Sequence, residues 1–463
     1  MKTDTIAAIA TALTDSGIGI IRISGPEAIQ IADRVFITRG GKHIFHTFDT
    51  HTIHYGFIAD GEEIIDEVMV SLMKAPRSYT MEDTVEINCH GGVLTMRKIL
   101  EAVIKNGARM AEPGEFTKRA FLNGRIDLSE AEAVMDLIQS KNDFAMKSSM
   151  KQLRGSVSDE IKSLRAAILY EIAFIESALD DPEHISTEGY PEKLSGIVDG
   201  LLKRLKKLLD SADNGKMLKE GINTVIVGKP NAGKSSLLNL LVGEEKAIVT
   251  SVAGTTRDAL QENIRLNGIS LNMIDTAGIR QTDDIVEKIG VDRAKKYAKE
   301  ADLILYVVDS SVDFDDSDLQ IMDMIRDKKT IVLLNKTDLT SVVTEERFCE
   351  VYGAAAENLR IIRTSAKENI GMDEFEENIK EMFFSGEIHM EDEIVITNMR
   401  HKEAIQNAFE SLKMVKQSLE DDMPEDFYSI DLMSAYTSLG YIIGEEVGDD
   451  LVNEIFSKFC MGK

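Results

Sequence analysis

The chain is poor in cysteine and in long hydrophobic runs, and its negative side chains outnumber its positive ones. Its three cysteines, Cys89, Cys349 and Cys460, are scattered and form no CxxC pair, which argues against a disulfide framework and a structural zinc site. No apolar run approaches the roughly 18 residues of a membrane span, and the N-terminus carries no signal-peptide pattern. We therefore expect a cytoplasmic protein that does not enter a membrane.

The excess of negative charge is uneven along the chain. The formal net charge is −27, with 53 Lys and Arg against 80 Asp and Glu, but residues 1–125 hold 14 basic and 16 acidic side chains and are nearly neutral. Such a charge excludes non-specific nucleic-acid binding over the whole surface. A nucleic-acid partner would meet the N-terminal part or a local basic groove, and the alternative is that the charge serves solubility alone.

A length of 463 residues predicts about three domains. Residues 1–118 predict an α+β domain, with strands at 17–23, 51–58, 64–72 and 84–88 and helices at 26–36 and 93–105. From Asp127 the apolar period becomes helical, and Asp127 and Glu130 have the spacing of a capping box. Apolar stripes over 128–138, 161–179, 194–208 and 405–419 predict the core of a helical bundle.

Residues 222–362 interrupt this helical pattern with an alternation of β-rich runs and helical segments. The runs are 222–227, 269–274, 303–308, 331–334 and 359–362, and the alternation predicts a parallel, doubly wound sheet. Because helical stripes lie on both sides, we expect this α/β domain to be inserted into one helical domain. The predicted boundaries are 1–118 for the α+β domain, 119–220 and 383–463 for the two parts of the helical domain, and 221–382 for the insert.

A phosphate-binding loop follows the first of these runs. The sequence Gly228-Lys-Pro-Asn-Ala-Gly233-Lys234-Ser235-Ser236 is a complete GxxxxGK[ST] between a predicted strand and a predicted helix. Its backbone N–H groups and the helix N-terminus can surround phosphates. Lys234 is expected to reach the β- and γ-phosphates, and the Ser235 hydroxyl to bind magnesium.

Three further motifs complete the predicted nucleotide site. Asp275-Thr-Ala-Gly278 follows the second run, where the carboxylate can hold the magnesium shell and the Gly278 N–H can meet the γ-phosphate. Asn335-Lys336-Thr337-Asp338 follows the fourth run, and the Asp338 carboxylate can accept two hydrogen bonds from the N–H edge of guanine, which adenine cannot supply. Ser365-Ala366-Lys367 then backs the base, so the sequence predicts a GTPase.

The glutamine that orients the attacking water in Ras-like switches is missing. Ile279 stands in its place, directly after Asp275-Thr-Ala-Gly278. Glu287 offers a carboxylate as a base or water-positioner in the segment that follows. From the residues alone, a solvated charge on a helix is the competing interpretation of Glu287.

Motifs along the whole chain resemble the MnmE/TrmE family of tRNA-modification GTPases. They are Gly254-Thr-Thr-Arg-Asp258, Asp275-Thr-Ala-Gly-Ile-Arg280 and Phe459-Cys-Met-Gly-Lys463, with Ile21-Arg-Ile-Ser-Gly25, His90-Gly-Gly92, Pro113-Gly-Glu-Phe-Thr117 and Ala120-Phe-Leu-Asn-Gly-Arg-Ile-Asp-Leu128 in the N-terminal part. The resemblance implies an N-terminal tetrahydrofolate-binding domain that dimerises, a split all-α helical domain and an inserted Ras-like P-loop GTPase domain.

The resemblance also implies a reaction and partners. The family acts as a homodimer with an FAD-containing partner, in a heterotetramer, on the wobble uridine of certain tRNAs. It installs a carboxymethylaminomethyl or aminomethyl group whose carbon comes from a 5-formyl or methylene form of tetrahydrofolate. Its GTP hydrolysis depends on potassium, and neither the tRNAs nor the amine donor, glycine or ammonium, follow from this sequence.

Residue roles come from the resemblance by motif match. The implied folate-binding residues are Arg22, Glu86, Arg125 and Lys463; the implied potassium ligands are Asn231, Thr250, Val252 and Thr255; magnesium falls on Ser235 and Thr256; and the water-orienting glutamate falls on Glu287. The implied GTP-binding residues are Gly228, Asn231, Ala232, Gly233, Lys234, Ser235, Ser236, Thr250, Ser251, Val252, Ala253, Gly254, Thr255, Thr256, Asp275, Thr276, Ala277, Gly278, Asn335, Lys336, Asp338, Ser365, Ala366 and Lys367.

Two questions stay open at this point, the role of Cys460 and the function of the whole chain. Cys460 is either a functional thiol or a small buried side chain. The whole chain is either the tRNA-modifying GTPase, a non-catalytic GTP-dependent assembly factor, or an autonomous folate enzyme with a regulatory GTPase domain. Folate binding and activity without the flavoprotein distinguish these functions.

Overall fold

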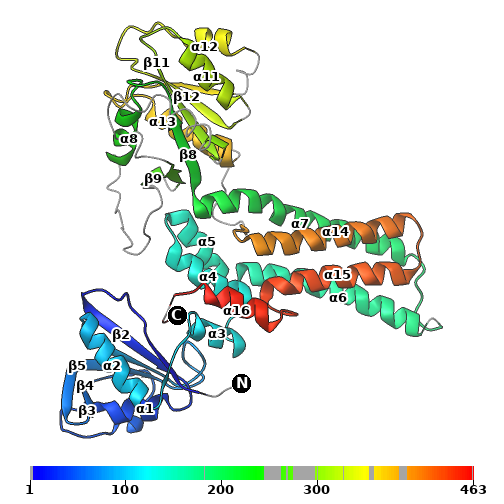
Figure 1. Ribbon diagram of the computed structural model, residues 1–463. Coiled ribbons are helices and arrows are strands. Elements are labelled where there is room, and N and C mark those ends of the chain that lie inside the picture. The colour runs from blue at the N-terminus through cyan, green and yellow to red at the C-terminus, as the bar shows by residue number, and fades with distance from the viewer. Residues whose placement is uncertain are drawn as a thin grey trace. The chain divides into compact units, whose positions relative to one another are not determined.

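The computed structural model describes residues 4–181, 183–243, 262–266, 269–274, 298–299, 301–326, 328–353, 359–384, 394–460 and 462 (Figure 1). The chain divides into two compact units. The first consists of Met1–Ile138, Ser149–Val198 and Asn407–Lys463, and the second of Gln139–Ser148 and Asp199–Gln406. Helices α5 (Asp143–Leu153), α7 (Tyr190–Glu220) and α14 (Met399–Glu420) contribute to both units.

A seven-stranded sheet forms the N-terminal part of the first unit, in the order β3-β4-β5-β6-β2-β1-β7. Its strands are β1 (Ile6–Ile9), β2 (Ser16–Ser24), β3 (Phe36–Thr38), β4 (Thr52–Asp60), β5 (Glu63–Met73), β6 (Thr84–Gly91) and β7 (Arg109–Met110). Only the β1–β7 pair is parallel. The four predicted strands correspond to β2, β4, β5 and β6, whereas β1, β3 and β7, which are all short, were not predicted.

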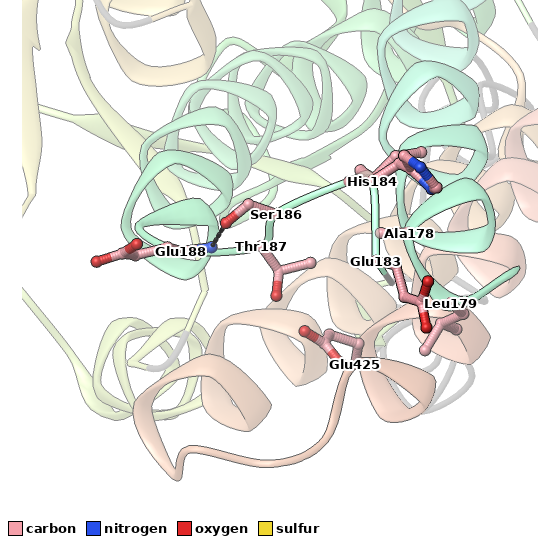
Figure 2. Close-up of a pocket in the computed structure, with 9 residues that line it drawn as sticks. Ala178, Leu179, Glu183, His184, Ser186, Thr187, Glu188 and Glu425 are labelled. Carbon is pink, nitrogen blue, oxygen red and sulfur yellow. Dashed lines mark hydrogen bonds between the residues drawn. The ribbon is translucent and has the colours of Figure 1, made fainter. Parts of the chain in front are cut away.

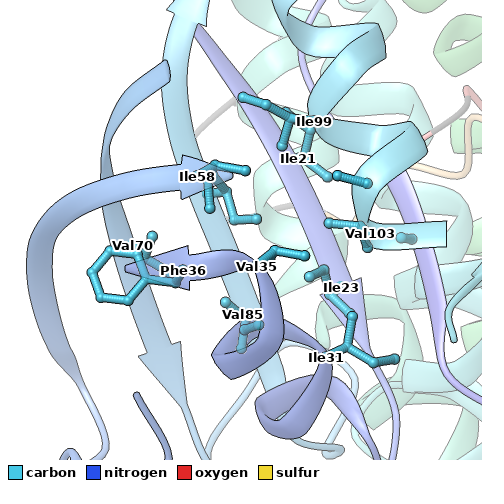
Figure 3. Packing of buried hydrophobic residues seen from close by; sticks show 14 of the residues in the cluster. Ile21, Ile23, Ile31, Val35, Phe36, Ile58, Val70, Val85, Ile99 and Val103 are labelled. Atoms are coloured by element: carbon cyan, nitrogen blue, oxygen red, sulfur yellow. The ribbon is translucent and has the colours of Figure 1, made fainter. Parts of the chain in front are cut away.

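Two helices cover one face of this sheet. Helices α1 (Ala28–Val35) and α2 (Val93–Lys105) place Ile31 and Val103 against Ile23 and other strand residues in one buried cluster (Figure 3). Successive side chains of a strand point to opposite faces, so the residues between the buried ones lie on the other face. There Arg22 of β2 and Glu86 of β6 are directly opposite each other in the antiparallel register.

The rest of the first unit is helical. It contains α3 (Glu115–Leu122), α4 (Leu128–Gln139), α6 (Ser156–Asp180), α15 (Glu425–Ile443) and α16 (Asp449–Ser457). The predicted capping box at the start of α4 is confirmed, because the Asp127 N–H donates to Glu130 Oε2 at 2.8 Å and the Glu130 N–H to Asp127 Oδ1 at 3.0 Å. The stripe along α6 is buried as predicted up to Ile175, but Leu179 at its end is exposed.

The second unit contains a six-stranded sheet in the order β13-β12-β11-β8-β10-β9. Its strands are β8 (Ile222–Val227), β9 (Glu262–Leu266), β10 (Ile269–Met273), β11 (Leu303–Asp309), β12 (Thr330–Asn335) and β13 (Arg360–Arg363). The five predicted strands are present and pair in parallel. Strand β9 was not predicted; it pairs antiparallel with β10 at the edge, so the sheet is mixed.

Helices lie on both faces of this sheet. Helices α8 (Lys234–Gly243) and α13 (Met372–Phe384) share a buried cluster with Leu305 and Leu333, whereas α11 (Asp316–Ile325) and α12 (Glu345–Tyr352) share another with Tyr306 and Val332. This is the predicted doubly wound arrangement, and the fold class is confirmed. In the part of the chain that the structure describes, no helix is long and apolar enough to cross a membrane. The residue limits of the three predicted domains stay predictions.

Candidate functional site

The phosphate loop joins β8 to α8 at the carboxyl end of the parallel strands. Gly228 and Gly233 have φ values of +150° and +103°. A Cβ on Gly228 would lie 2.4 Å from the Val307 carbonyl oxygen, and one on Gly233 would lie 2.1 Å from Asn335 Nδ2. Asn231, in the same loop, has a φ of +61° and is exposed. The loop conformation therefore requires glycine at two of the motif positions.

Lys234 lies at the centre of this loop. Its Nζ donates to the carbonyl oxygens of Gly228 at 2.7 Å and Lys229 at 2.5 Å. Burial lowers the pKa of Lys234 to about 8, because its charged form is partly removed from water. Phosphate oxygens are acceptors of the same kind that also carry negative charge, so a phosphate at this position would stabilise the ammonium. Ser235 and Ser236 follow in the exposed first turn of α8.

Asn335 connects the phosphate loop to the loops predicted to hold the base. Its Nδ2 donates to the Ala232 carbonyl oxygen at 2.9 Å, and its Oδ1 accepts the Ala366 N–H at 3.1 Å. The side chain is buried. One amide thus joins three segments: Ala232 is 103 residues from Asn335 in the sequence, and Ala366 is 31 residues from it.

Asp338 is held at the surface beside these loops. The Ser365 hydroxyl donates to its Oδ1 at 2.7 Å, and the Glu368 N–H donates to that hydroxyl at 3.2 Å. Asp338 is exposed, whereas Ser365 is buried. A carboxylate oriented in this way can accept paired N–H donors from a ligand.

Lys336 lies in the same region and forms an ion pair with Asp309. It has a φ of +65°, and its Nζ lies 2.5 Å from Asp309 Oδ2. Burial acts to raise the pKa of Asp309, but the hydrogen bonds from Lys336 and Ser311 outweigh it, and the pKa is lowered. Lys367 is exposed and pairs only loosely with Glu368, at 3.8 Å.

Several predicted site residues lie outside the described residues. They are Thr250, Ser251, Val252, Ala253, Gly254, Thr255 and Thr256; Asp275, Thr276, Ala277 and Gly278; Glu287; and Lys463. The predicted site residues that the structure does bring together in the second unit are Gly228, Asn231, Ala232, Gly233, Lys234, Ser235, Ser236, Asn335, Lys336, Asp338, Ser365, Ala366 and Lys367.

A second group of predicted residues gathers in the first unit. Arg22 Nε and Nη2 both lie 2.8 Å from Glu86 Oε1, and Arg22 Nη1 donates to the Gly462 carbonyl oxygen at 3.1 Å. Tyr79 lies under both predicted arginines, with its ring centroid 5.4 Å from Arg22 Cζ and 4.5 Å from Arg125 Cζ. These contacts join β2, β6 and the C-terminus of the chain.

Sequence reasoning missed Tyr79 and Gly462 in this group. No motif included Tyr79, although it stands between two predicted strands. Gly462 has a φ of +84°, and a Cβ there would lie 2.4 Å from the Ile9 carbonyl oxygen. The glycine of the C-terminal CMGK therefore reflects a close approach of the backbone to β1, which the motif alone did not reveal.

Cys460 and Cys89 differ in their surroundings. Cys460 is exposed, so the interpretation of it as a small buried side chain is wrong. Its carbonyl oxygen accepts the Gly114 N–H at 3.3 Å. Cys89 is buried, and burial together with the nearby Asp66 raises the pKa of its thiol to about 11.

An open pocket of about 720 Å³ lies in the helical part of the first unit. It is lined by the end of α6, the loop that follows it and Glu425 at the start of α15 (Figure 2). Ser186 Oγ accepts the Glu188 N–H at 3.2 Å within this loop. No predicted site residue lines the pocket, and the described residues hold no cluster of three or more His, Cys, Asp or Glu side chains that could bind a metal.

Comparison with known proteins covers the whole chain. The MnmE helical domain model matches residues 128–460, and the model of the GTP-binding protein TrmE N-terminus matches residues 5–125. The chain is 58% identical to the tRNA modification GTPase MnmE of Lachnoclostridium phytofermentans over 100% of both chains. It is 49% identical to that of Alkaliphilus metalliredigens and 48% identical to that of Clostridioides difficile, each over 99% of both chains.

Solved structures resemble a part of the chain. A variant of Aquifex aeolicus Era bound to GDP.AlF4- is 29% identical, with a TM-score of 0.28, over 42% of this chain and 67% of that chain. The G domain of the T. maritima FeoB iron transporter is 25% identical, with a TM-score of 0.26, over 35% of this chain and 97% of that chain.

Proposed function

The chain belongs to the MnmE family of tRNA modification GTPases, and from this premise we propose that it hydrolyses GTP with potassium and uses a folate one-carbon unit to modify tRNA. The observation that carries the nucleotide part is the Asn335 side chain, which holds the phosphate loop and the base loop together at 2.9 Å and 3.1 Å. A rigid link between these loops sets the distance between phosphates and guanine that a GTP molecule must match.

In this proposal each nucleotide contact has a physical reason. Lys234 exchanges the loop carbonyls for β- and γ-phosphate oxygens, which stabilise its charge. Asp338, oriented by Ser365, accepts the N–H edge of guanine and rejects adenine, because adenine would leave the carboxylate unpaired. Glu287 orients the attacking water in place of the missing glutamine.

Two cations complete the proposed site. Magnesium would be held by Ser235, in the exposed first turn of α8 next to Lys234, and by Thr256. Potassium would be held by the exposed amide oxygen of Asn231, with Thr250, Val252 and Thr255. A cation at this point supplies the positive charge that an arginine finger provides elsewhere, where it is worth about 10³–10⁵ in rate.

The Arg22 group has the donors and acceptors that a folate requires. The Glu86 carboxylate can accept N–H groups of a pterin ring, and Arg22 orients it through Nε and Nη2. The Tyr79 ring offers an aromatic face, and Arg125 and Lys463 can meet the negative glutamate tail. The ligand would be the 5-formyl or methylene form of tetrahydrofolate.

The partners in this proposal follow the reaction. The tRNA supplies the wobble uridine, and an FAD-containing protein works with this chain to install the amine and the folate one-carbon unit on it. The chain acts as a homodimer within a heterotetramer in the cytoplasm. The product is a carboxymethylaminomethyl or aminomethyl group on the uridine. Hydrolysis of GTP would control access to this chemistry by a conformational cycle.

Reconstitution tests the proposal as a whole. The chain, an FAD-containing partner protein, unmodified tRNA, GTP, methylene-tetrahydrofolate and an amine donor, glycine or ammonium, would be incubated in potassium buffer. The wobble nucleoside would then be analysed by mass spectrometry. Modification that requires all components is the expected result. Modification without the flavoprotein would instead support an autonomous folate enzyme, and absence of folate binding would support a GTP-dependent assembly factor.

A further inference from the structure

Lys229 occupies a position of the phosphate loop that the GxxxxGK[ST] motif leaves unspecified. Its side chain leaves the loop and ends between two carboxylates of α11. The Nζ lies 2.6 Å from Asp318 Oδ2 and 3.0 Å from Asp315 Oδ2. Only 19% of the Lys229 side chain is exposed, and 2% of the Asp318 side chain. An ion pair this far removed from water differs from the mobile surface pairs that most lysines form.

The Asp318 carboxylate, which pairs with Lys229, also accepts two other hydrogen bonds. Asp318 Oδ1 accepts the Tyr306 hydroxyl at 3.0 Å, and Oδ2 accepts the Asp315 N–H at 3.1 Å. Tyr306 lies in β11 and is itself fully buried. Asp315 is the N-cap of α11, and its Oδ1 accepts the backbone N–H groups of Ser317 and Asp318. The N-terminal end of α11 is therefore held in place by several hydrogen bonds within the second unit.

The backbone of Lys229 is equally constrained on the loop side. Its carbonyl oxygen accepts Lys234 Nζ at 2.5 Å and the Ala232 N–H at 3.3 Å. Lys229 thus connects the centre of the phosphate loop, through its side chain, to the capped end of α11. Burial acts to lower the pKa of Lys229, but the carboxylates of Asp318 and Asp315 outweigh it and raise that pKa.

We propose that Lys229 is a positioning residue for nucleotide binding: its ion pair with Asp318 holds the phosphate loop in the conformation that receives the β-phosphate. This inference rests on the proposed nucleotide site and goes beyond it, because Lys229 acts through the loop and does not touch the nucleotide. A buried ion pair adds little net stability, since desolvation offsets its attraction. In this proposal the ion pair instead restricts the phosphate loop to one conformation.

The competing role for Lys229 is a direct charge contact with phosphate, and the two roles predict opposite results for Asp318→Asn. If Lys229 contacted phosphate, releasing it from Asp318 would strengthen nucleotide binding, and loss of its charge would weaken GTP more than GDP. If Lys229 positions the loop, Asp318→Asn and Lys229→Met weaken binding alike. GDP and GTP, which share the β-phosphate, then lose the same factor.

The test is a double-mutant cycle on the full-length chain. The affinities for GDP and GTP and the KM and kcat of hydrolysis would be measured for Lys229→Met, Asp318→Asn, their combination and Lys229→Arg. We expect each single variant to bind both nucleotides about tenfold more weakly, with KM rising by a similar factor. The double variant should lose no more than either single one, since both remove the same ion pair. Lys229→Arg, which keeps the charge, should recover most of the affinity.

Matched controls keep the test decisive. Lys380→Met removes a lysine from an exposed pair with Glu377, 3.8 Å apart, in the same unit, and should bind GDP as the unaltered chain does. Thermal unfolding of every variant reports folding, and Asp318→Asn, which keeps the shape of the side chain, serves if Lys229→Met is unfolded.

Asp338→Asn is measured alongside, as a separate test of the nucleotide site. If Asp338→Asn loses GTP while Lys229→Met and Asp318→Asn bind GDP normally, the positioning role is wrong and the nucleotide site stands; if Asp338→Asn keeps GTP, the nucleotide site itself is wrong.

Discussion

Asn335 and Ala232 are joined by a hydrogen bond of 2.9 Å that runs from the side-chain amide of one loop to the backbone carbonyl of another. Their separation of 103 residues means that the bond forms only when the sheet of the second unit is assembled. The structure therefore couples the phosphate loop, through one side chain, to the loop that we propose holds the base. Three predictions concern this region, and a fourth concerns the Arg22 group of the first unit.

Asn335→Ala should weaken GTP and GDP binding together. The substitution leaves the Ala232 carbonyl and the Ala366 N–H without this partner, and an unsatisfied buried polar group costs about 1–3 kcal/mol. We expect affinities lower by about 5- to 150-fold for both nucleotides, measured by fluorescence titration. A loss confined to GTP would contradict a role in joining the loops, since GDP uses both loops as well.

Gly233→Ala should abolish nucleotide binding while the first unit stays folded. The new Cβ would lie 2.1 Å from Asn335 Nδ2 at a φ of +103°, so the loop or the amide must move. Gly196→Ala in α7 is the control, because a Cβ there meets nothing within 4 Å. Alanine is favoured over glycine in a helix by about 1 kcal/mol, so this control should raise the melting temperature slightly and bind GTP normally. Normal GTP affinity of Gly233→Ala would refute the observed packing of the loop against Asn335.

Asp338→Asn should exchange guanine preference for xanthine preference. In the proposed site the Asp338 carboxylate would accept two N–H donors of guanine, whereas an amide would supply one donor and match the carbonyl that xanthine presents. Competition between GTP and xanthosine triphosphate measures the change, which we expect to exceed about tenfold in the affinity ratio. An unchanged ratio would remove Asp338 from the base site.

Arg22→Ala should reduce folate binding and leave GTP affinity unchanged. Glu86 would lose the guanidinium that lies 2.8 Å from its Oε1, and Tyr79 would lose one of its two cationic neighbours. We expect affinity for 5-formyltetrahydrofolate to fall at least about tenfold in calorimetric titration. Arg97→Ala, an exposed arginine on α2, is the matched control. Equal folate affinity of the Arg22 and Arg97 variants would place the folate elsewhere.

The sequence was sufficient for elements with a long, regular pattern. Strand β8 and helix α2 have the predicted limits, because an apolar run or a 3.6-residue period continues through their whole length. Strands β1 and β7 have four and two residues and are held by pairing with distant segments. Strand β9 owes its direction to the β10 pairing, which no local pattern encodes.

The same distinction between local patterns and long-range contacts applies to the candidate sites. The phosphate and base loops follow from motifs, because each needs particular residues at a fixed local spacing. The Asn335–Ala232 bond, the place of Tyr79 between two arginines and the Lys229–Asp318 pair depend on how distant segments pack. A single sequence carries no signal for such contacts, so only the folded chain reveals them.

Wobble-uridine mass spectrometry tests the central claim most directly. Transfer RNA would be isolated from cells that lack this protein and from the same cells supplied with the unaltered chain, Arg22→Ala, Asp338→Asn or the control Arg97→Ala. The proposed function predicts that the unaltered chain and Arg97→Ala restore a carboxymethylaminomethyl or aminomethyl group on the wobble uridine, whereas Arg22→Ala and Asp338→Asn do not. Identical wobble nucleosides with and without the protein would contradict it.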